Sequence, residues 1–120
     1  MDYRKKMDLS NKLALVTGAG QGIGEAIAEA LAATGAEVIC TDILLDRATT
    51  TAQALKAKGY LARAESLDVT DSAAINTLAQ ALPALDILVC NAGIVTNTPA
   101  EHMTDEEWDN VININLTGIF

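Results

Sequence analysis

The stretch ALVTGAGQGIGEA, residues 14–26, places four glycines between an apolar run and a segment of helix formers. The apolar run Leu13–Val16 predicts a buried strand that ends at Thr17 and Gly18. From Ile23 onward the apolar residues follow helical spacing, so the glycines form the turn between a strand and a helix. A backbone without side chains suits a phosphate group at this point, because phosphate needs close N–H donors and a helix N-terminus aimed at it.

The spacing of this turn is G-x-x-x-G-x-G, made by Gly18, Gly22 and Gly24. We expect Gly18 to turn the chain off the strand, Gly22 to let the backbone meet a pyrophosphate, and Gly24 to let the helix press onto the sheet. The pattern differs from G-x-G-x-x-G, and no Gly-Lys-Ser/Thr follows it, which excludes a Walker A loop. Taken alone, a turn of this kind also fits a loop that is merely flexible.

The alternation of strand and helix continues along the chain. Apolar runs predict further strands at Val38–Thr41, within Leu61–Leu67 and at Ile87–Cys90. Amphipathic spacing predicts helices between the strands and after the last one, with Gly35 and Gly59 ending the first two, Asp71 capping the third and a Thr104–Glu107 capping box starting the fourth. This order predicts an α/β fold with a Rossmann-type, doubly wound parallel sheet, covered on both faces, in the strand order 3-2-1-4.

This topology makes the first and fourth strands neighbours at the point where the winding reverses, and ligands bind there beyond the strand ends. The loop NAGI, residues 91–94, then meets the glycine turn. Asp42 ends the second strand, where an acid can accept both ribose hydroxyls of an adenosine and repel a 2′-phosphate. No arginine or lysine stands inside the glycine turn, where Gln21 sits. These features favour NAD over NADP, although Asp42 alone would also fit a strand-ending or capping acid.

Composition excludes several other classes of function. The formal net charge of −8 disfavours nucleic acid and anionic membranes as partners, and no apolar run approaches the ~20 residues of a membrane span. The basic cluster Arg4–Lys6 is expected to be a solvated tail, and no signal peptide is apparent. Cys40 and Cys90 are predicted to be small buried hydrophobes in a reducing, cytoplasmic compartment. His102 is expected to be solvated, and no metal site is predicted.

Five motifs occur in one order along the chain: TGAGQGIG (17–24), Asp42, LDVTD (67–71), NAG (91–93) and NINLTGIF (113–120). Together they resemble the short-chain dehydrogenase/reductase family in its classical branch, specifically its N-terminal, cofactor-binding half. The resemblance runs from about residue 12 to the last residue. It implies an oxidoreductase that transfers hydride between a nicotinamide cofactor and an alcohol or carbonyl compound.

The resemblance also implies roles for single residues. The glycine turn would hold the pyrophosphate, Asp42 the adenosine ribose, and Asp68 with Val69 the adenine, while the loop after the fourth strand would line the crevice. The candidate cofactor-binding residues are Gly18, Gln21, Gly22, Ile23, Gly24, Asp42, Asp68, Val69, Asn91, Ala92 and Gly93. Asn115 matches the family's active-site asparagine, which bends a helix and holds a water in a proton relay. Outside this context Asn115 would be an ordinary helix asparagine.

The family's acid/base is a tyrosine four residues before a lysine, with a serine upstream. Here Met7 follows Tyr3 and Ala64 follows Tyr60 at that spacing, so the pair is missing from these residues. We therefore expect a tail at residues 1–11 and an incomplete dinucleotide-binding half-domain at 12–120, truncated after about four strands and inactive alone. Its function would be that of an NAD-dependent oxidoreductase of small alcohols or carbonyls, a homo-oligomer when complete. The alternative is a stand-alone nucleotide-binding module or a remnant without catalysis.

Overall fold

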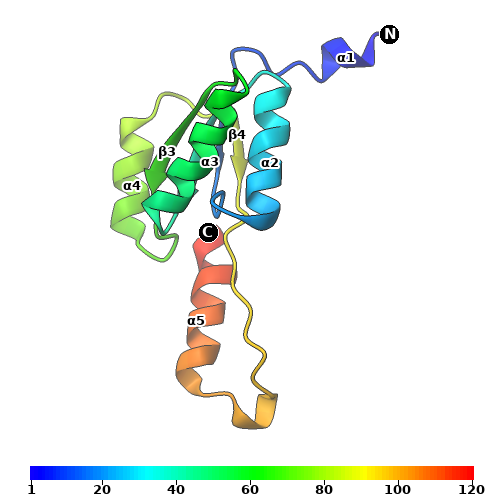
Figure 1. Ribbon diagram of the computed structural model, residues 1–120. Coiled ribbons are helices and arrows are strands. Elements are labelled where there is room, and N and C mark those ends of the chain that lie inside the picture. Colours follow the sequence, from blue (N-terminus) through cyan, green and yellow to red (C-terminus); the bar gives the residue numbers. More distant parts are fainter.

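Four parallel strands form a single sheet in the computed structural model, which describes residues 1–120 (Figure 1). The strand order is β3-β2-β1-β4, which confirms the predicted α/β topology of the Rossmann type. In the register, Leu15 of β1 lies opposite Ile39 of β2 on one side and Leu88 of β4 on the other. The strands are β1 (Leu13–Val16), β2 (Glu37–Asp42), β3 (Ala62–Ser66) and β4 (Ile87–Val89).

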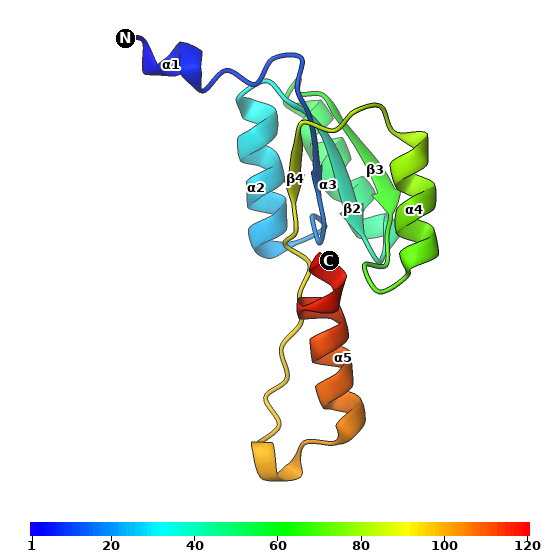
Figure 2. The same cartoon turned by 180° about the vertical axis from the view of Figure 1, so that it is seen from behind.

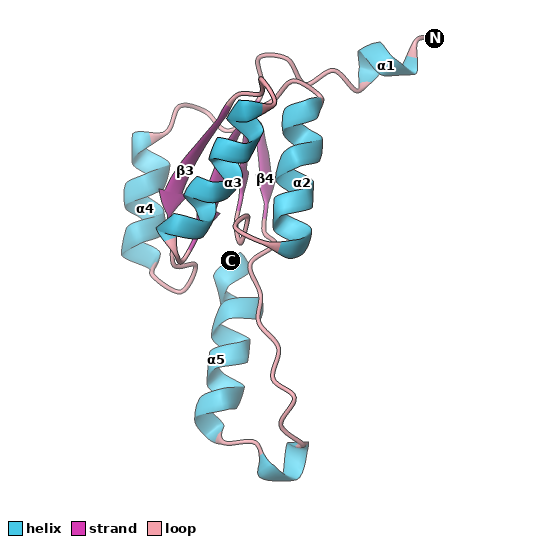
Figure 3. Ribbon diagram, viewed as in Figure 1, coloured by secondary structure: helices cyan, strands magenta, loops and turns pink.

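Helices connect the strands and follow the last one (Figure 3). The predicted end signals hold: Gly35 and Gly59 follow α2 and α3 with φ of 106° and 86°, and the Asp71 side chain caps α4. Both hydrogen bonds of the Thr104–Glu107 capping box are present at α5. The helices are α1 (Tyr3–Lys6), α2 (Gly22–Ala33), α3 (Leu45–Ala57), α4 (Ser72–Ala81) and α5 (Asp105–Asn115), with short 3-10 turns η1 (Ala100–His102) and η2 (Thr117–Ile119).

The core lies on both faces of the sheet because side chains alternate along each strand. Ala14 and Val16 of β1 join the cluster formed with α2 and α3, which lie on one face. Leu13 and Leu15 point the other way and join Ile39 in a smaller cluster on the face that α4 covers (Figure 2). Small side chains dominate the first cluster, so α2 and α3 approach the sheet closely.

The position of α5 differs from the expectation that helices cover both faces. It extends away from the carboxyl edge of the sheet, beside the chain that leads to it, while α1 protrudes at the opposite end, and the molecule measures 53 × 29 × 29 Å. No residue of α5 is buried. Beside β4 the sheet face is open instead, as a groove of about 460 Å³ with mostly apolar walls. The capping box specifies a helix locally, but it does not decide where that helix lies.

The structure confirms one expectation about single residues and corrects two others. Cys40 is buried, and burial raises the pKa of its thiol to about 11. Cys90, in contrast, is exposed, because β4 ends at Val89 and lies at the sheet edge. The basic cluster is exposed as expected, but it forms the short helix α1 rather than an irregular tail. None of the helices has the length and apolar character that crossing a membrane requires.

Candidate cofactor site

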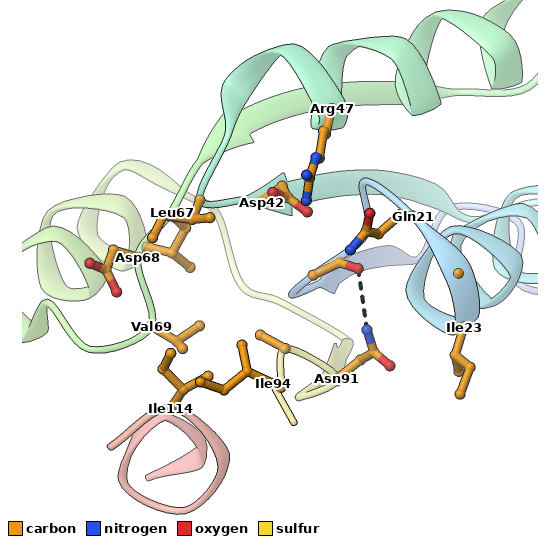
Figure 4. Close-up of a pocket in the computed structure, with 15 residues that line it drawn as sticks. Gln21, Ile23, Asp42, Arg47, Leu67, Asp68, Val69, Asn91, Ile94 and Ile114 are labelled. Atoms are coloured by element: carbon orange, nitrogen blue, oxygen red, sulfur yellow. Dashed lines mark hydrogen bonds between the residues drawn. The ribbon is translucent and has the colours of Figure 1, made fainter. Parts of the chain in front are cut away.

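A pocket of about 380 Å³ opens at the carboxyl ends of β1, β2 and β4 (Figure 4). Its place is the one predicted from the topology, where the winding of the sheet reverses. Every candidate cofactor residue except Gly24 lies in its wall. The lining residues are Gly18, Gln21, Gly22, Ile23, Asp42, Ile43, Arg47, Leu67, Asp68, Val69, Asn91, Ala92, Gly93, Ile94 and Ile114.

The first turn of α2 presents free backbone donors to this pocket. Gln21 is the N-cap, and its side chain makes no capping hydrogen bond. The N–H groups of the next residues, from Gly22 to Gly24, therefore have no partner within the helix or its cap. Gly22 has a φ of 59°, and a Cβ there would meet no atom within 4 Å, so the space in front of its backbone is open. Such a helix start is suited to an anion.

Gly24 serves the site from behind rather than from its wall. A Cβ at this position would overlap the carbonyl oxygen of Gly18 and lie 2.5 Å from Nδ2 of Asn91. Gly24 therefore allows α2 to pack closely, as predicted. The prediction had the helix pressing onto the sheet, whereas at Gly24 it packs against the glycine turn and Asn91.

Asn91 and Thr17 join the two loops that form the pocket. Nδ2 of Asn91 donates to the carbonyl oxygens of Thr17, at 3.1 Å, and Gly18, at 3.3 Å. In return, Oγ1 of Thr17 accepts the N–H groups of Asn91 and Ala92, both at 3.0 Å. These bonds hold the end of β1 against the loop after β4, so the predicted meeting of the two loops is confirmed in atomic detail.

Asp42 places a fixed carboxylate at the end of β2. Its exposed fraction is 6%. Oδ2 accepts the N–H of Gly20 at 3.2 Å, and Oδ1 accepts that of Leu44 at 3.0 Å. Each carboxylate oxygen can accept more than one hydrogen bond, so acceptor capacity remains for hydroxyl groups of a ligand.

Asp68 and Val69 form the opposite side of the pocket. Oδ1 of Asp68 accepts the N–H and the hydroxyl of Thr70, at 2.9 and 2.7 Å, which fixes the turn after β3. Val69 and Ile114 of α5 both line the pocket on this side (Figure 4). This wall combines apolar surface with one carboxylate, as a planar base with polar edges requires.

Asn115 lies outside the pocket wall. Its Oδ1 accepts the N–H of Ile94 and its Nδ2 donates to the carbonyl of the same residue, both at 2.8 Å. The α-helix ends at Asn115 and continues as the 3-10 turn η2. The asparagine side chain therefore holds the loop that lines the pocket. It also lies beside Gly93, where a Cβ would be 3.3 Å from Oδ1 of Asn115.

The structure brings five residues to the pocket that were not among the candidate cofactor-binding residues, although Leu67 and Ile94 stand in motifs that the sequence analysis named: Ile43, Arg47, Leu67, Ile94 and Ile114. Arg47 matters most, because it adds a positive charge beside Asp42. Its place in the first turn of the helix after Asp42 was the available signal. The glycine turn itself contains no basic residue.

The arrangement fits an elongated diphosphate carrying a hydroxylated ring. Free N–H groups of α2 suit the diphosphate, the buried Asp42 carboxylate suits hydroxyl groups, and the apolar wall at Val69 suits a planar base. No group of three or more His, Cys, Asp or Glu side chains is placed to hold a metal ion.

Comparison with known proteins agrees with this geometry. A family model described as short chain dehydrogenase matches residues 12–120. Galactitol 2-dehydrogenase of Agrobacterium fabrum is 47% identical over 116 residues, which cover 93% of this chain and 44% of that protein. The 3-oxoacyl-(acyl-carrier-protein) reductase FabG of Escherichia coli is 43% identical over 118 residues, which cover 95% of this chain and 47% of the reductase.

Among solved structures, a gluconate 5-dehydrogenase from Burkholderia cenocepacia in complex with NADP and tartrate has a TM-score of 0.87 and 33% identity. The match covers 98% of this chain and 48% of that one. The chain thus spans about half the length of the relatives it matches.

Proposed function

The chain belongs to the short-chain dehydrogenase family, and from this premise we propose that residues 12–120 form the dinucleotide-binding part of an NAD-dependent oxidoreductase. The whole protein would transfer hydride between nicotinamide and a small alcohol or carbonyl compound. One observation carries the proposal: a helix start with free N–H groups and a buried carboxylate face the same pocket.

In this proposal, different residues of the pocket bind different parts of the dinucleotide. The N–H groups of Gly22 and Ile23, which line the pocket, bind the pyrophosphate, and Asp42 accepts hydrogen bonds from the adenosine ribose. Asp68 and Val69 flank the adenine. When bound, the nicotinamide ring supplies the hydride acceptor or donor.

Asn115 acts in this proposal as a positioning residue. Both polar ends of its side chain are bonded to the backbone of Ile94. It thereby fixes the loop from Asn91 to Gly93 that lines the crevice, and its place at the end of α5 marks where the helix changes geometry. The proton relay implied by the family would use this same helix end.

The preference for NAD rests on Asp42. A buried carboxylate repels a phosphate on the ribose that it contacts, and the pocket offers it no room to turn away because backbone donors hold both of its oxygens. The Burkholderia relative was solved with NADP, so the two cofactors are compared directly in the experiment below.

A calorimetric titration with NAD and NADP tests the proposal. We expect Asp42→Ala to weaken NAD binding by about tenfold or more, since a hydrogen bond to a charged group contributes about 1.5–3 kcal/mol, and to change NADP binding far less. Asp42→Asn provides a second variant that keeps the shape and removes the charge. The matched control is Asp46→Ala, which removes an exposed carboxylate of α3 outside the pocket. Equal affinity of the unchanged protein for NAD and NADP would contradict the preference.

A separate observation supports the alternative function, a nucleotide-binding module without catalysis. These 120 residues contain no tyrosine four positions before a lysine. We expect the 120-residue chain to bind NAD but to oxidise or reduce no alcohol or ketone. Turnover above a no-protein control would show that these 120 residues contain an acid/base other than a Tyr-x-x-x-Lys pair. The coding sequence after Phe120 separates the two functions: a serine and a Tyr-x-x-x-Lys pair favour the oxidoreductase, and an immediate stop codon favours the module.

A further inference from the structure

Thr51 is a buried polar side chain to which the proposed function gives no role. It lies in α3 and is 3% exposed, between the buried apolar residues Ala48 and Leu55 of the same helix. Its Oγ1 donates a hydrogen bond of 3.0 Å to the carbonyl oxygen of Ala19, which lies in the glycine turn, 32 positions earlier in the chain. This bond connects α3 directly to the backbone of the cofactor site.

The carbonyl of Ala19 depends on this hydroxyl. Ala19 is completely buried, and its carbonyl oxygen accepts no other hydrogen bond in the structure. A buried carbonyl without a partner costs free energy comparable to a lost hydrogen bond. If the hydroxyl of Thr51 were removed, the peptide group would therefore gain by turning its oxygen toward another donor.

The other end of the same peptide group holds the buried acid of the site. The N–H of Gly20 donates to Oδ2 of Asp42 at 3.2 Å. The peptide bonds of the chain are trans, and a trans peptide group is planar with its C=O and N–H pointing in opposite directions. The Ala19–Gly20 peptide is thus held at its oxygen by Thr51 and at its nitrogen by Asp42. A rotation that reorients the oxygen also takes the N–H away from the carboxylate.

The surrounding backbone encloses this peptide between β2 and α3. The N–H of Ala19 donates to the carbonyl of Thr41 at 2.8 Å. A Cβ at Gly20 would lie 2.5 Å from Cβ of Arg47 and 2.6 Å from Oδ2 of Asp42. The peptide therefore has no side chain of its own that could fix its orientation on the Gly20 side, and its hydrogen bonds do so instead.

The bond to Gly20 is one of two that fix the carboxylate of Asp42. The other joins Oδ1 to the N–H of Leu44 at 3.0 Å, so loss of the Gly20 bond would leave Oδ2 without its backbone donor. A group that has to be ordered when its ligand arrives binds more weakly than one that is fixed beforehand. The start of α2 is held separately, by the close packing of Gly24 against Gly18 and Asn91.

We propose that Thr51 is a positioning residue of the cofactor site: its hydroxyl fixes the Ala19–Gly20 peptide, and this peptide fixes the carboxylate of Asp42 that accepts the ribose hydroxyls. The inference rests on the proposed dinucleotide function. It adds to the site a residue that does not line the pocket, because Thr51 acts from behind the glycine turn.

The first experiment compares NAD binding by the protein, Thr51→Val and Thr51→Ser in calorimetry. Valine keeps the shape of threonine and removes the hydroxyl, whereas serine keeps the hydroxyl. We expect Thr51→Val to lose roughly threefold to tenfold in NAD affinity, the effect of one neutral hydrogen bond, and Thr51→Ser to stay within about twofold of the unaltered protein. Urea unfolding establishes that each variant is folded. Thr51→Ala removes the same hydroxyl from a smaller side chain and replaces Thr51→Val if valine prevents folding.

A double-mutant cycle tests whether Thr51 acts through Asp42. In an Asp42→Ala background, Thr51→Val should change NAD affinity by less than about twofold, because the group that it positions is gone. A merely structural role of Thr51 would give the same loss of affinity in both backgrounds.

Two other threonines provide matched controls. Thr50 is the neighbouring residue of α3, is exposed, and donates to the carbonyl of Asp46 within its own helix at 2.9 Å. Thr41 is completely buried and donates to the carbonyl of Val16 at 2.9 Å, so its hydroxyl joins β2 to β1 rather than to the glycine turn. Thr50→Val should leave NAD affinity unchanged. Thr41→Val should lower stability, since it also leaves a buried carbonyl without its hydroxyl donor, but keep NAD affinity.

Several results would overturn the inference. These are unchanged NAD affinity in folded Thr51→Val, failure of serine to restore the affinity, an equal loss in the Asp42→Ala background, and an equal loss in Thr41→Val. In each case NAD binding by the unaltered protein would leave the proposed function standing. An unaltered protein that does not bind NAD would overturn the proposed function and this inference together.

Discussion

Gly22 and Gly24 stand in the same turn of α2, but different constraints require glycine at the two positions. Gly22 has a φ of 59° and open space where a side chain would project. At Gly24, a Cβ would overlap the Gly18 carbonyl and crowd Asn91. Gly22 leaves the space of the pocket open, and Gly24 allows α2 to pack against the glycine turn.

Alanine substitutions separate these two roles. We expect Gly22→Ala to fold, with a loss of about 1–2 kcal/mol for a side chain in the left-handed region, and to lose NAD binding because the methyl group occupies the space of the pyrophosphate. Gly24→Ala should lose more stability, since the helix must move away from the turn. Urea unfolding and NAD titration measure the two effects. A folded Gly22→Ala protein with unchanged NAD affinity would show that the glycine turn is not part of the cofactor site.

At the scale of elements, Glu107 connects α5 to the chain that precedes it. Its Oε2 accepts the N–H of Thr104 at 2.9 Å, and its Oε1 accepts the hydroxyl of Thr98 at 2.7 Å. These two bonds, the backbone bond first, lower the pKa of the Glu107 carboxyl below its ordinary value. The helix that extends from the body is thus anchored by a titratable group.

A depressed pKa makes this contribution to folding pH-dependent. The stabilisation is complete above the ordinary pKa of a glutamate, about 4.3, and disappears as the pH falls through the lower folded value. We expect the protein to be more stable than Glu107→Gln at neutral pH, with a difference that shrinks on acidification. Fluorescence of Trp108, the single tryptophan of the chain, follows α5 during urea unfolding.

The control for this measurement is Glu106→Gln, in the same helical turn but with a side chain outside the capping box. Its stability relative to the unaltered protein should not follow the same pH profile. A difference between the protein and Glu107→Gln that stays constant from neutral to acid pH would contradict the role of the carboxylate.

At the scale of the whole molecule, the two edges of the sheet differ in chemistry. β3, at one edge, carries Arg63 and Glu65. β4, at the other edge, has the sequence ILV, its Leu88 is 59% exposed, and it borders the apolar groove. Charges protect an edge strand from pairing with another chain, whereas an uncharged apolar edge invites it.

We therefore expect the 120-residue chain to self-associate through β4 with rising concentration. Leu88→Lys should shift the population toward monomer in sedimentation velocity, because a charge at the edge opposes strand pairing. Leu61→Lys is the matched control, since Leu61 is similarly exposed, at 65%, beside the charged edge β3. A chain that stays monomeric at high concentration, or equal effects of both variants, would exclude this route.

Apart from the short helix α1, the sequence by itself determined the order of the strands and the longer helices, and with it the sheet topology. Apolar periodicity, Gly35, Asp71 and the Thr104–Glu107 box act through the local backbone, so they can be read from neighbouring positions. The glycine turn and Asp42 were predictable for the same reason: each directly follows a strand, and the handedness of parallel connections brings strand ends to one edge.

Only the tertiary structure decided which side chains surround those strand ends. Arg47 and Asp42 both lie against Gly20, which leaves space for them, and Asn115 bonds to Ile94 because α5 ends beneath the sheet edge. The exposure of Cys90 likewise depends on β4 having a single neighbour. The physical reason is that hydrogen bonds and charge contacts act over a few ångströms between segments distant in sequence, whereas periodicity describes only how each segment folds along its own length.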